Sequence, residues 1–254
     1  MIFGHEWYLY LAFFGIGAFT SAINSIAGGG SSVSIPLMIF CGLPPMVANG
    51  TNRIGLLFGN FASAYNLFRR NLLNVGIFYR LVVPTVIGSV AGIFFLAKIS
   101  DRLFQVILSL AIFFVVIASN LKPNFLGKPP SEVPQKLSPA AFFGFLCVAI
   151  YGSIVQIGVG FVQILALSRY TGLDLLHVNA LKNALTCSFL LVSTIGLVCM
   201  GKVEWGLAVS TSLGALCGGL YGSHLQCKKG NVFIRRVISV ASLCLAIFLI
   251  KDLF

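Results

Sequence analysis

The hydrophobic positions of the chain gather in ten apolar segments that are separated by polar residues, glycine or proline. The segments cover residues 7–27, 31–43, 46–68, 75–97 and 103–121, and then residues 138–157, 160–171, 177–198, 205–224 and 233–250. A straight helix needs about 20 apolar residues to cross the hydrocarbon layer of a bilayer, and all but the second segment of each series approach this length. The pattern therefore predicts an all-α polytopic membrane protein.

A polar linker divides the two series of segments. Residues 122–137 contain three lysines and four prolines, a composition that neither inserts into lipid nor forms a long helix. We therefore expect a first membrane repeat over residues 1–121, a linker over residues 122–137, and a second membrane repeat over residues 138–254.

The two series are related to each other at an offset near 130 residues, which indicates a duplicated unit. The Gly28–Gly30 triplet falls on Gly158-Val159-Gly160. Because the second segment of each series is too short to cross a bilayer, we expect the first two segments of each repeat to form a broken or re-entrant helical hairpin, followed by three transmembrane helices. An odd number of crossings then places the copies in opposite orientations. The prediction is two inverted repeats, as in many secondary transporters.

The fourth segments of the two repeats share a pattern of small residues. Gly88 and Gly92 stand four residues apart in the first repeat, and Gly214 and Gly218 stand four residues apart in the second. This spacing lets membrane helices approach closely. We therefore interpret these glycines as packing positions rather than ligand-binding positions.

The composition agrees with a membrane protein and excludes several other classes. Hydrophobic residues make up 58% of the chain and charged residues 9%, whereas soluble proteins have roughly 25% charged residues. The net charge of +11 comes from scattered lysines and arginines, so it does not form the contiguous basic face that nucleic acid requires. The seven cysteines lie mostly in apolar runs without a Cys-x-x-Cys pair. We therefore expect no metal and no cofactor.

The basic residues between the segments predict the orientation in the membrane. Four lie on one predicted side, namely Lys98, Arg102, Lys202 and Lys251, and eleven on the other, namely Arg69, Arg70, Arg80, Lys122, Lys128, Lys136, Arg169, Lys228, Lys229, Arg235 and Arg236. By the positive-inside rule the larger group is cytoplasmic. We expect a multi-pass protein of the cytoplasmic membrane, with both termini outside and no cleaved signal peptide.

Two basic residues, Arg53 and Lys182, fall inside predicted membrane segments at nearly matching positions of the two repeats. All six carboxylates of the chain lie in loops or at segment ends. A cation within a membrane segment costs about 2.5 kcal/mol or more, so it usually faces a cavity or a partner. The alternative is snorkelling, in which a long side chain extends to the membrane interface. We favour a cavity-facing pair.

The glycine-rich stretches predict where the hairpins break. A short helix that begins near Gly30, within residues 24–32 (NSIAGGGSS), would direct free N–H groups and its positive dipole end into the protein, which creates an anion site. The matching residues 156–163 (QIGVGFVQ) are less polar. Such glycines also serve as turns or packing sites. The candidate substrate-binding residues are Asn24, Ser25, Gly28, Gly29, Gly30, Ser31, Ser32, Asn49, Thr51, Asn52, Arg53, Gln156, Gly158, Gly160, Gln163, Asn179, Lys182 and Asn183.

No catalytic motif accompanies these residues. The three histidines, His5, His177 and His224, lie far apart near segment ends, and no His-x-x-x-His or His-Glu-x-x-His pair is present. Serine, threonine and asparagine within membrane segments more often satisfy helix backbones than act as nucleophiles. We therefore do not expect an enzyme.

Two motifs in the first repeat resemble those of the TauE/SafE family, a group of sulfite exporters and toluene-sulfonate uptake permeases. They are residues 27–38 (AGGGSSVSIPLM) and residues 42–53 (GLPPMVANGTNR), and the similarity extends over essentially the whole chain. In the second repeat, Gly158–Gly160, Gly172–Asp174 and Lys182 are similar to the family's looser second motif.

This resemblance implies a permease for small anions such as sulfite, thiosulfate, sulfonates or sulfoacetate. Together with the embedded cations, it leads us to expect a secondary transporter that works by alternating access, with the anion and the lipid bilayer as its partners. The alternative is an anion channel of the same architecture, which would pass current far above carrier turnover. Candidates for coupling to protons are His177, Asp174 and the substrate's own proton.

Overall fold

The computed structural model describes residues 6–120 and 138–251, and all regular secondary structure in these ranges is helical. The predicted first repeat contains α1 (Trp7–Ala27), α2 (Ser31–Phe40), α3 (Pro45–Arg69), α4 (Val75–Leu96) and α5 (Asp101–Asn120). The second contains α6 (Pro139–Ile154), α7 (Val159–Thr171), α8 (Leu175–Cys199) and α9 (Trp205–Lys251). The predicted all-α membrane class is confirmed, while the predicted linker at 122–137 lies outside the described residues.

Helix lengths agree closely with the apolar segments. Among the described residues, α1, α4 and α8 are long and apolar enough to cross a membrane. The short second segments correspond to α2 with 10 residues and α7 with 13 residues. Each hairpin therefore breaks between its two helices, because α1 itself is continuous over 21 residues.

One boundary in the second repeat differs from the sequence prediction. A connection between the last two apolar segments is predicted around residues 225–236, but in the structure helical residues extend from both sides up to Gly230. The helix is interrupted only at Gly230, whose φ of 70° and ψ of −168° are not helical. A single glycine suffices for the kink because, without a Cβ, it adopts positive φ without steric cost. The lysines before it stay helical because lysine is a good helix former.

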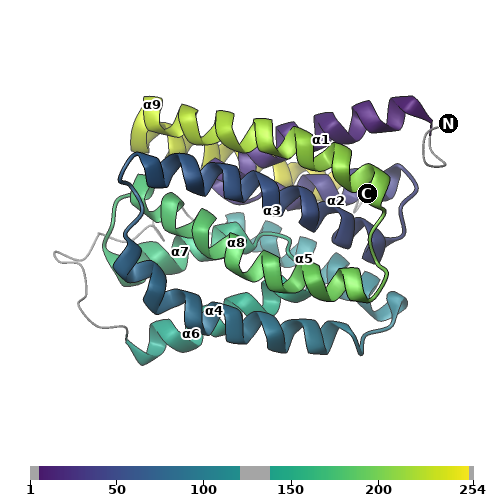
Figure 1. Ribbon diagram of the computed structural model, residues 1–254, viewed down its shortest axis with the longest axis horizontal. Coiled ribbons are helices and arrows are strands. Elements are labelled where there is room, and N and C mark those ends of the chain that lie inside the picture. The colour runs from purple at the N-terminus through teal and green to yellow at the C-terminus, as the bar shows by residue number, and fades with distance from the viewer. Residues whose placement is uncertain (1–5, 121–137, 252–254) are drawn as a thin grey trace.

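The outer helices of the bundle pack across the two repeats. Figure 1 shows α1 beside α9 along one edge and α4 beside α6 along the opposite edge. A Cβ built on Gly214 would lie 2.0 Å from the Phe14 carbonyl oxygen, and one on Gly88 would lie 2.3 Å from the Leu146 carbonyl oxygen. The packing role predicted for these glycines is thus confirmed. In both pairs the fourth helix of one repeat lies on the first helix of the other.

The centre of the bundle is formed by α3 and α8, which run antiparallel (Figure 1). Near the middle of α3, the Leu57 carbonyl lies beside Cys187, and farther along α3 the Ser63 hydroxyl accepts a hydrogen bond from Asn183. Residue numbers therefore rise along one helix where they fall along the other. This is the relation that inverted repeats require of their matching third segments, and the inversion of the complete repeats stays a prediction.

Candidate functional site

The two hairpin breaks touch at the centre of the protein. A Cβ built on Gly28 would lie 2.4 Å from the carbonyl carbon of Gly160, and a Cβ on Gly160 would lie 2.3 Å from the Gly28 Cα. The Ser31 hydroxyl donates a hydrogen bond of 3.0 Å to the Gln156 carbonyl. Two segments about 130 residues apart in sequence are thus brought together.

Local backbone geometry explains why glycine occupies these breaks. Gly28 closes α1 with φ 81° and Gly158 precedes α7 with φ 70°, both in the left-handed region. Gly160 has no such φ and owes its role to the close backbone contact alone. Gln156 also adopts a positive φ of 68°, which is uncommon for a residue with a side chain. The sequence contains no signal for this strained position.

Arg53 lies on α3 with its side chain fully buried. Its Nη2 donates to the Ile154 carbonyl at 3.2 Å, and Asn49 Nδ2, one turn earlier, donates to the same oxygen at 3.2 Å. Ile154 is the last residue of α6, where helix carbonyls lack partners and the dipole is negative. Arg53 Nε and Nη1 have no hydrogen-bond partner among the described residues. Two guanidinium nitrogens are therefore free to bind a ligand.

Lys182 makes the equivalent contact from the second repeat. Its Nζ donates to the carbonyls of Asn24 and Ser25, the latter at 3.0 Å, within the last turn of α1. Asn183 Nδ2 donates to the Ser25 carbonyl at 3.3 Å, and Asn179 Nδ2 donates to the Ile26 carbonyl at 2.8 Å. In each case, the cation on the third helix of one repeat (α3 or α8) caps the C-terminal end of the first helix of the other repeat (α6 or α1).

These contacts exclude snorkelling in this conformation, because the side chains of Arg53 and Lys182 are both 0% exposed. Within residues 6–120 and 138–251, neither cation has a carboxylate partner. Capping a helix C-terminus is a role that the sequence analysis did not anticipate. It accounts for one nitrogen of Arg53 and leaves its positive charge without a counter-ion.

The other candidate residues divide into two groups. Those with a side-chain nitrogen or oxygen that is unpartnered among the described residues include Ser32, Asn52 and Gln156. Thr51 and Gln163 have partners instead, since Thr51 Oγ1 accepts from the Glu204 N–H at 3.0 Å and Gln163 Oε1 accepts from Thr186 at 2.7 Å.

Two of the candidate glycines have packing neighbours. A Cβ on Gly29 would meet the Phe161 ring at 2.3 Å, and a Cβ on Gly30 would meet the Thr20 carbonyl oxygen at 2.1 Å. At these two positions the absence of a side chain permits close helix contact. Their backbone N–H groups still lie in the break, at the start of α2.

Three buried residues next to the site, Asn60, Ser63 and Gln226, were not among the candidates chosen from the sequence. Asn24 Nδ2 donates to Asn60 Oδ1 at 3.2 Å, Ser25 pairs with Ser63 at 2.8 Å, and Asn179 Nδ2 also donates to Gln226 Oε1 at 2.9 Å. Asn60 lies seven residues after Arg53, two turns farther along the same face of α3. That helical spacing was a usable signal for Asn60, whereas Gln226 falls in the connection predicted around residues 225–236, where no contact with the site was expected.

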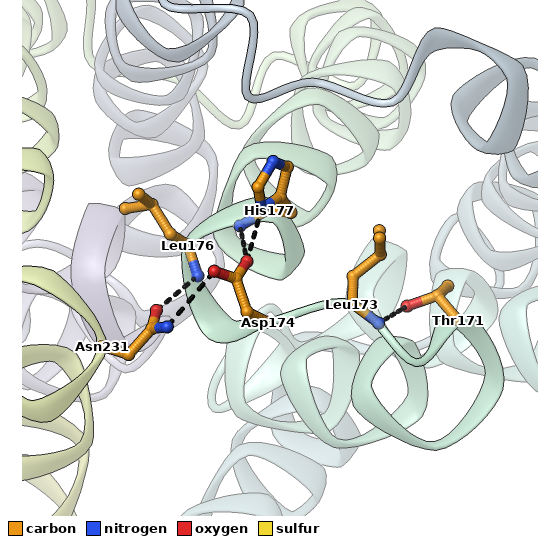
Figure 2. A network of polar contacts seen from close by, with 6 residues as sticks. All are labelled: Thr171, Leu173, Asp174, Leu176, His177 and Asn231. Carbon is orange, nitrogen blue, oxygen red and sulfur yellow. Dashed lines mark hydrogen bonds and ion pairs between the residues drawn. The ribbon is translucent and has the colours of Figure 1, made fainter. Parts of the chain in front are cut away.

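Asp174, a candidate for proton coupling, belongs to a separate network at the turn between α7 and α8. Figure 2 shows its carboxylate accepting from the His177 N–H at 3.0 Å, from the His177 ring, and from Asn231 Nδ2 at 3.2 Å. Asn231 in turn accepts from the Leu176 N–H at 3.1 Å. The network caps the start of α8 and connects α8 by hydrogen bonds to the part of α9 that follows Gly230.

The protonation state of Asp174 follows from these contacts. Burial raises the pKa of the carboxyl, but the hydrogen bonds from His177 and Asn231 and the charge of His177 together hold the pKa of Asp174 below its ordinary value of 3.8. The carboxylate therefore stays ionised at neutral pH. In this state it caps the start of α8 by accepting from the His177 N–H.

Comparison with known proteins identifies the group to which this chain belongs. The family model described as sulfite exporter TauE/SafE matches residues 13–249. The chain is 27% identical over 251 residues to the probable membrane transporter protein ORF9 of a Sinorhizobium species, covering 95% of this chain and 93% of that protein. It is 24% identical to a probable membrane transporter protein of Haemophilus influenzae, covering 94% and 93%.

A third relative is a protein of Bacillus subtilis. The probable membrane transporter protein YjnA of Bacillus subtilis is 28% identical over 241 residues, covering 83% of this chain and 88% of that protein. No solved structure matches the chain significantly. The family match spans both hairpin breaks and both buried cations. The chain therefore belongs to the sulfite exporter TauE/SafE family of membrane transporters.

Proposed function

We propose that the protein is a secondary transporter that moves sulfite, sulfonates or related sulfur oxyanions across the cytoplasmic membrane, and that Arg53 and Lys182 supply the positive charge of the substrate site. The observation that carries this proposal is the pair of unpartnered nitrogens on a fully buried arginine. A buried charge without a counter-ion is costly. An oxyanion would neutralise Arg53 and accept from both nitrogens through charge-assisted hydrogen bonds.

The hairpin breaks add to this positive potential. α2 begins at Ser31 and α7 begins at Val159, directly after the two breaks. The first N–H groups of a helix have no partner within it, and they carry the positive end of its dipole. Several of these N–H groups already donate to carbonyls of the breaks, Ser32 to Gly29 and Phe161 to Gly158 among them. The helix starts therefore add mainly the positive ends of two dipoles to the charge of the two cations, and this potential suits an anion.

Complete burial of both cations supports a carrier that works by alternating access. A channel needs a continuous open path in its conducting state, whereas a carrier closes around its site before it opens to the other side. Each cation contact, from Arg53 to Ile154 and from Lys182 to Ser25, joins the two repeats. Rocking of one repeat against the other would loosen these contacts and admit the anion.

Transport is expected to be saturable and selective for anions. Liposomes that contain the purified protein should exchange labelled sulfite or a labelled sulfonate, with rates that level off as substrate rises, because each turnover requires a conformational change. Empty liposomes give the background leak. Movement of only neutral or cationic solutes would reject the proposal, and an unsaturated current far above carrier turnover would favour the channel.

The proposed orientation places both termini outside and the predicted linker inside. Contacts between loops support the grouping of the basic residues. Lys202 forms an ion pair with Asp101 at 3.2 Å, so the α4–α5 and α8–α9 turns lie on one side. Arg70 meets His224 Nδ1 at 3.2 Å, so the ends of α3 and of the first part of α9 also lie together.

Impermeant thiol labelling of whole cells tests this orientation. In a variant without its native cysteines, Lys202→Cys should react from outside, and Ser131→Cys in the predicted linker should react only after the membrane is opened. The two positions serve as controls for each other, because both require the same expression and insertion. The reverse labelling pattern would overturn the orientation.

A further inference from the structure

Three buried asparagines at the site have side-chain oxygens without a donor. Asn49 Oδ1, Asn179 Oδ1 and Asn183 Oδ1 are unpartnered among the described residues, and the exposure of each residue is at most 1%. Asn49 precedes Arg53 by one turn of α3, and Asn183 is adjacent to Lys182 on α8. A cation and at least one free acceptor therefore occur together in each half of the site.

The orientation of these amides is determined by their backbone partners. The Nδ2 atom of each donates to a carbonyl, Asn49 to Ile154 at 3.2 Å, Asn179 to Ile26 at 2.8 Å and Asn183 to Ser25 at 3.3 Å. Rotating any of the amides by 180° would place two oxygens against each other. The free atoms are therefore acceptors and not donors.

Asn49 and Asn179 are also equivalent positions of the two repeats. They are separated by the repeat offset of 130 residues, and each donates to the end of the first helix of the other repeat. Among the other unpartnered atoms of the candidate residues, the Ser32 hydroxyl can donate as well as accept, Asn52 presents the donor Nδ2, and Gln156 presents one further acceptor, Oε1. Most of the unpartnered acceptors with a fixed orientation thus belong to the three asparagines.

We propose that the site selects anions that also carry a hydrogen-bond donor, such as a protonated oxyanion or an amino-substituted sulfonate. This inference rests on the proposed function of the same site. An oxyanion without hydrogen satisfies the free nitrogens of Arg53 but leaves the asparagine oxygens unpaired, and it brings its own negative oxygens toward them. An O–H or N–H on the anion satisfies both sets of atoms, and a site with buried polar groups discriminates strongly against a ligand that leaves them unpaired.

Sulfamate and methanesulfonate form a matched pair of probes for this selectivity. Both are monoanions of nearly the same shape at neutral pH, and they differ in an amino group where methanesulfonate has a methyl group. Titration calorimetry on the purified protein should show sulfamate binding about tenfold more tightly, the effect of roughly one hydrogen bond. Equal affinities, or tighter binding of methanesulfonate, would overturn the donor requirement while leaving the anion site intact.

Asparagine variants assign the preference to particular atoms. Asn49→Leu and Asn179→Leu should bring the sulfamate and methanesulfonate affinities close together, whatever the change in their common level, whereas Asn66→Leu should keep the two affinities apart. Asn66 is a suitable control because it lies on α3 but bonds to Ser223 near the far end of that helix. Retention of the preference in both site variants would overturn the assignment. If no sulfur oxyanion binds to the wild-type protein, the proposed function itself falls.

Discussion

Replacing Arg53 with glutamine is expected to weaken oxyanion binding by roughly tenfold to a hundredfold, the equivalent of a charge-assisted hydrogen bond of about 1.5–3 kcal/mol. The side chain is fully buried, and its Nε and Nη1 atoms are the free donors of the site. Asn49 still donates to the Ile154 carbonyl in this variant, so the helix cap is partly kept while the charge and the fork of donors are lost. Affinity is measured by titration of sulfite or a sulfonate.

Companion variants separate charge, donor geometry and helix capping. Arg53→Lys keeps the charge without the planar fork, so it should fall between wild type and Arg53→Gln. Lys182→Gln should weaken binding over the same tenfold to hundredfold range, and it should also lower thermal stability because Nζ caps two carbonyls of α1. Arg69→Gln is the matched control, since Arg69 is exposed at the end of the same helix as Arg53.

The outcomes distinguish a substrate site from a purely structural one. If both cations only cap helix ends, Arg53→Gln and Lys182→Gln would lower the unfolding temperature and leave the affinity of the folded fraction near that of the wild type. That result would discard the site. A selective loss of affinity in variants that still fold and insert would support it.

The fold was largely predictable because its signals are local. Apolar length identified the helices, and glycine-rich stretches marked the breaks where φ is positive or backbones touch. The small-residue spacing at Gly88 and Gly214 also indicated close packing correctly, because a Cβ there would collide with the facing helix. These features depend on one segment at a time, so a single sequence contains them. The connection between the last two helical segments was predicted but is shorter than expected, because the polar residues around Gly230 belong to the ends of the two helices.

The site was only partly predictable, since its contacts join the two repeats. Buried cations and their repeat-related positions were visible in the sequence, but the partner of Arg53 is a backbone carbonyl, and carbonyls have no sequence signal. Thr51 was expected at the site and instead accepts a hydrogen bond from the Glu204 N–H. Gln226 reaches Asn179 only because α9 packs beside α1 and α8. Such pairings follow from tertiary structure and not from local pattern.

Replacing Gly28 with alanine is expected to disrupt the contact between the two hairpin breaks. Two separate costs apply at this position. The left-handed φ of 81° disfavours a side chain by about 1–2 kcal/mol. A new Cβ would also lie 2.4 Å from the Gly160 backbone, where overpacking costs about 1–3 kcal/mol or more because backbone yields less readily than a side chain. The combined loss is a large share of the stability of a typical domain.

Two single substitutions separate these costs. Gly42→Ala introduces the strain alone, because Gly42 has φ 96° and nothing within 4 Å of its Cβ position. Gly160→Ala introduces the collision alone, because its φ is not positive and its Cβ would lie 2.3 Å from the Gly28 Cα. We expect Gly42→Ala to fold and transport nearly normally with a slightly lower unfolding temperature in detergent. Gly160→Ala should lose most of its transport, and Gly28→Ala should be the most impaired in both measurements.

The comparison shows whether the contact between the breaks matters for transport or only for folding. If the anion site depends on the breaks touching, Gly160→Ala protein that is recovered in folded form should still bind oxyanions more weakly, because a shift of the backbone displaces the starts of α2 and α7 from the bound anion. Equal behaviour of Gly160→Ala and Gly42→Ala in folding, binding and transport would contradict this, and the close approach of Gly28 and Gly160 would then be packing without a role in the site.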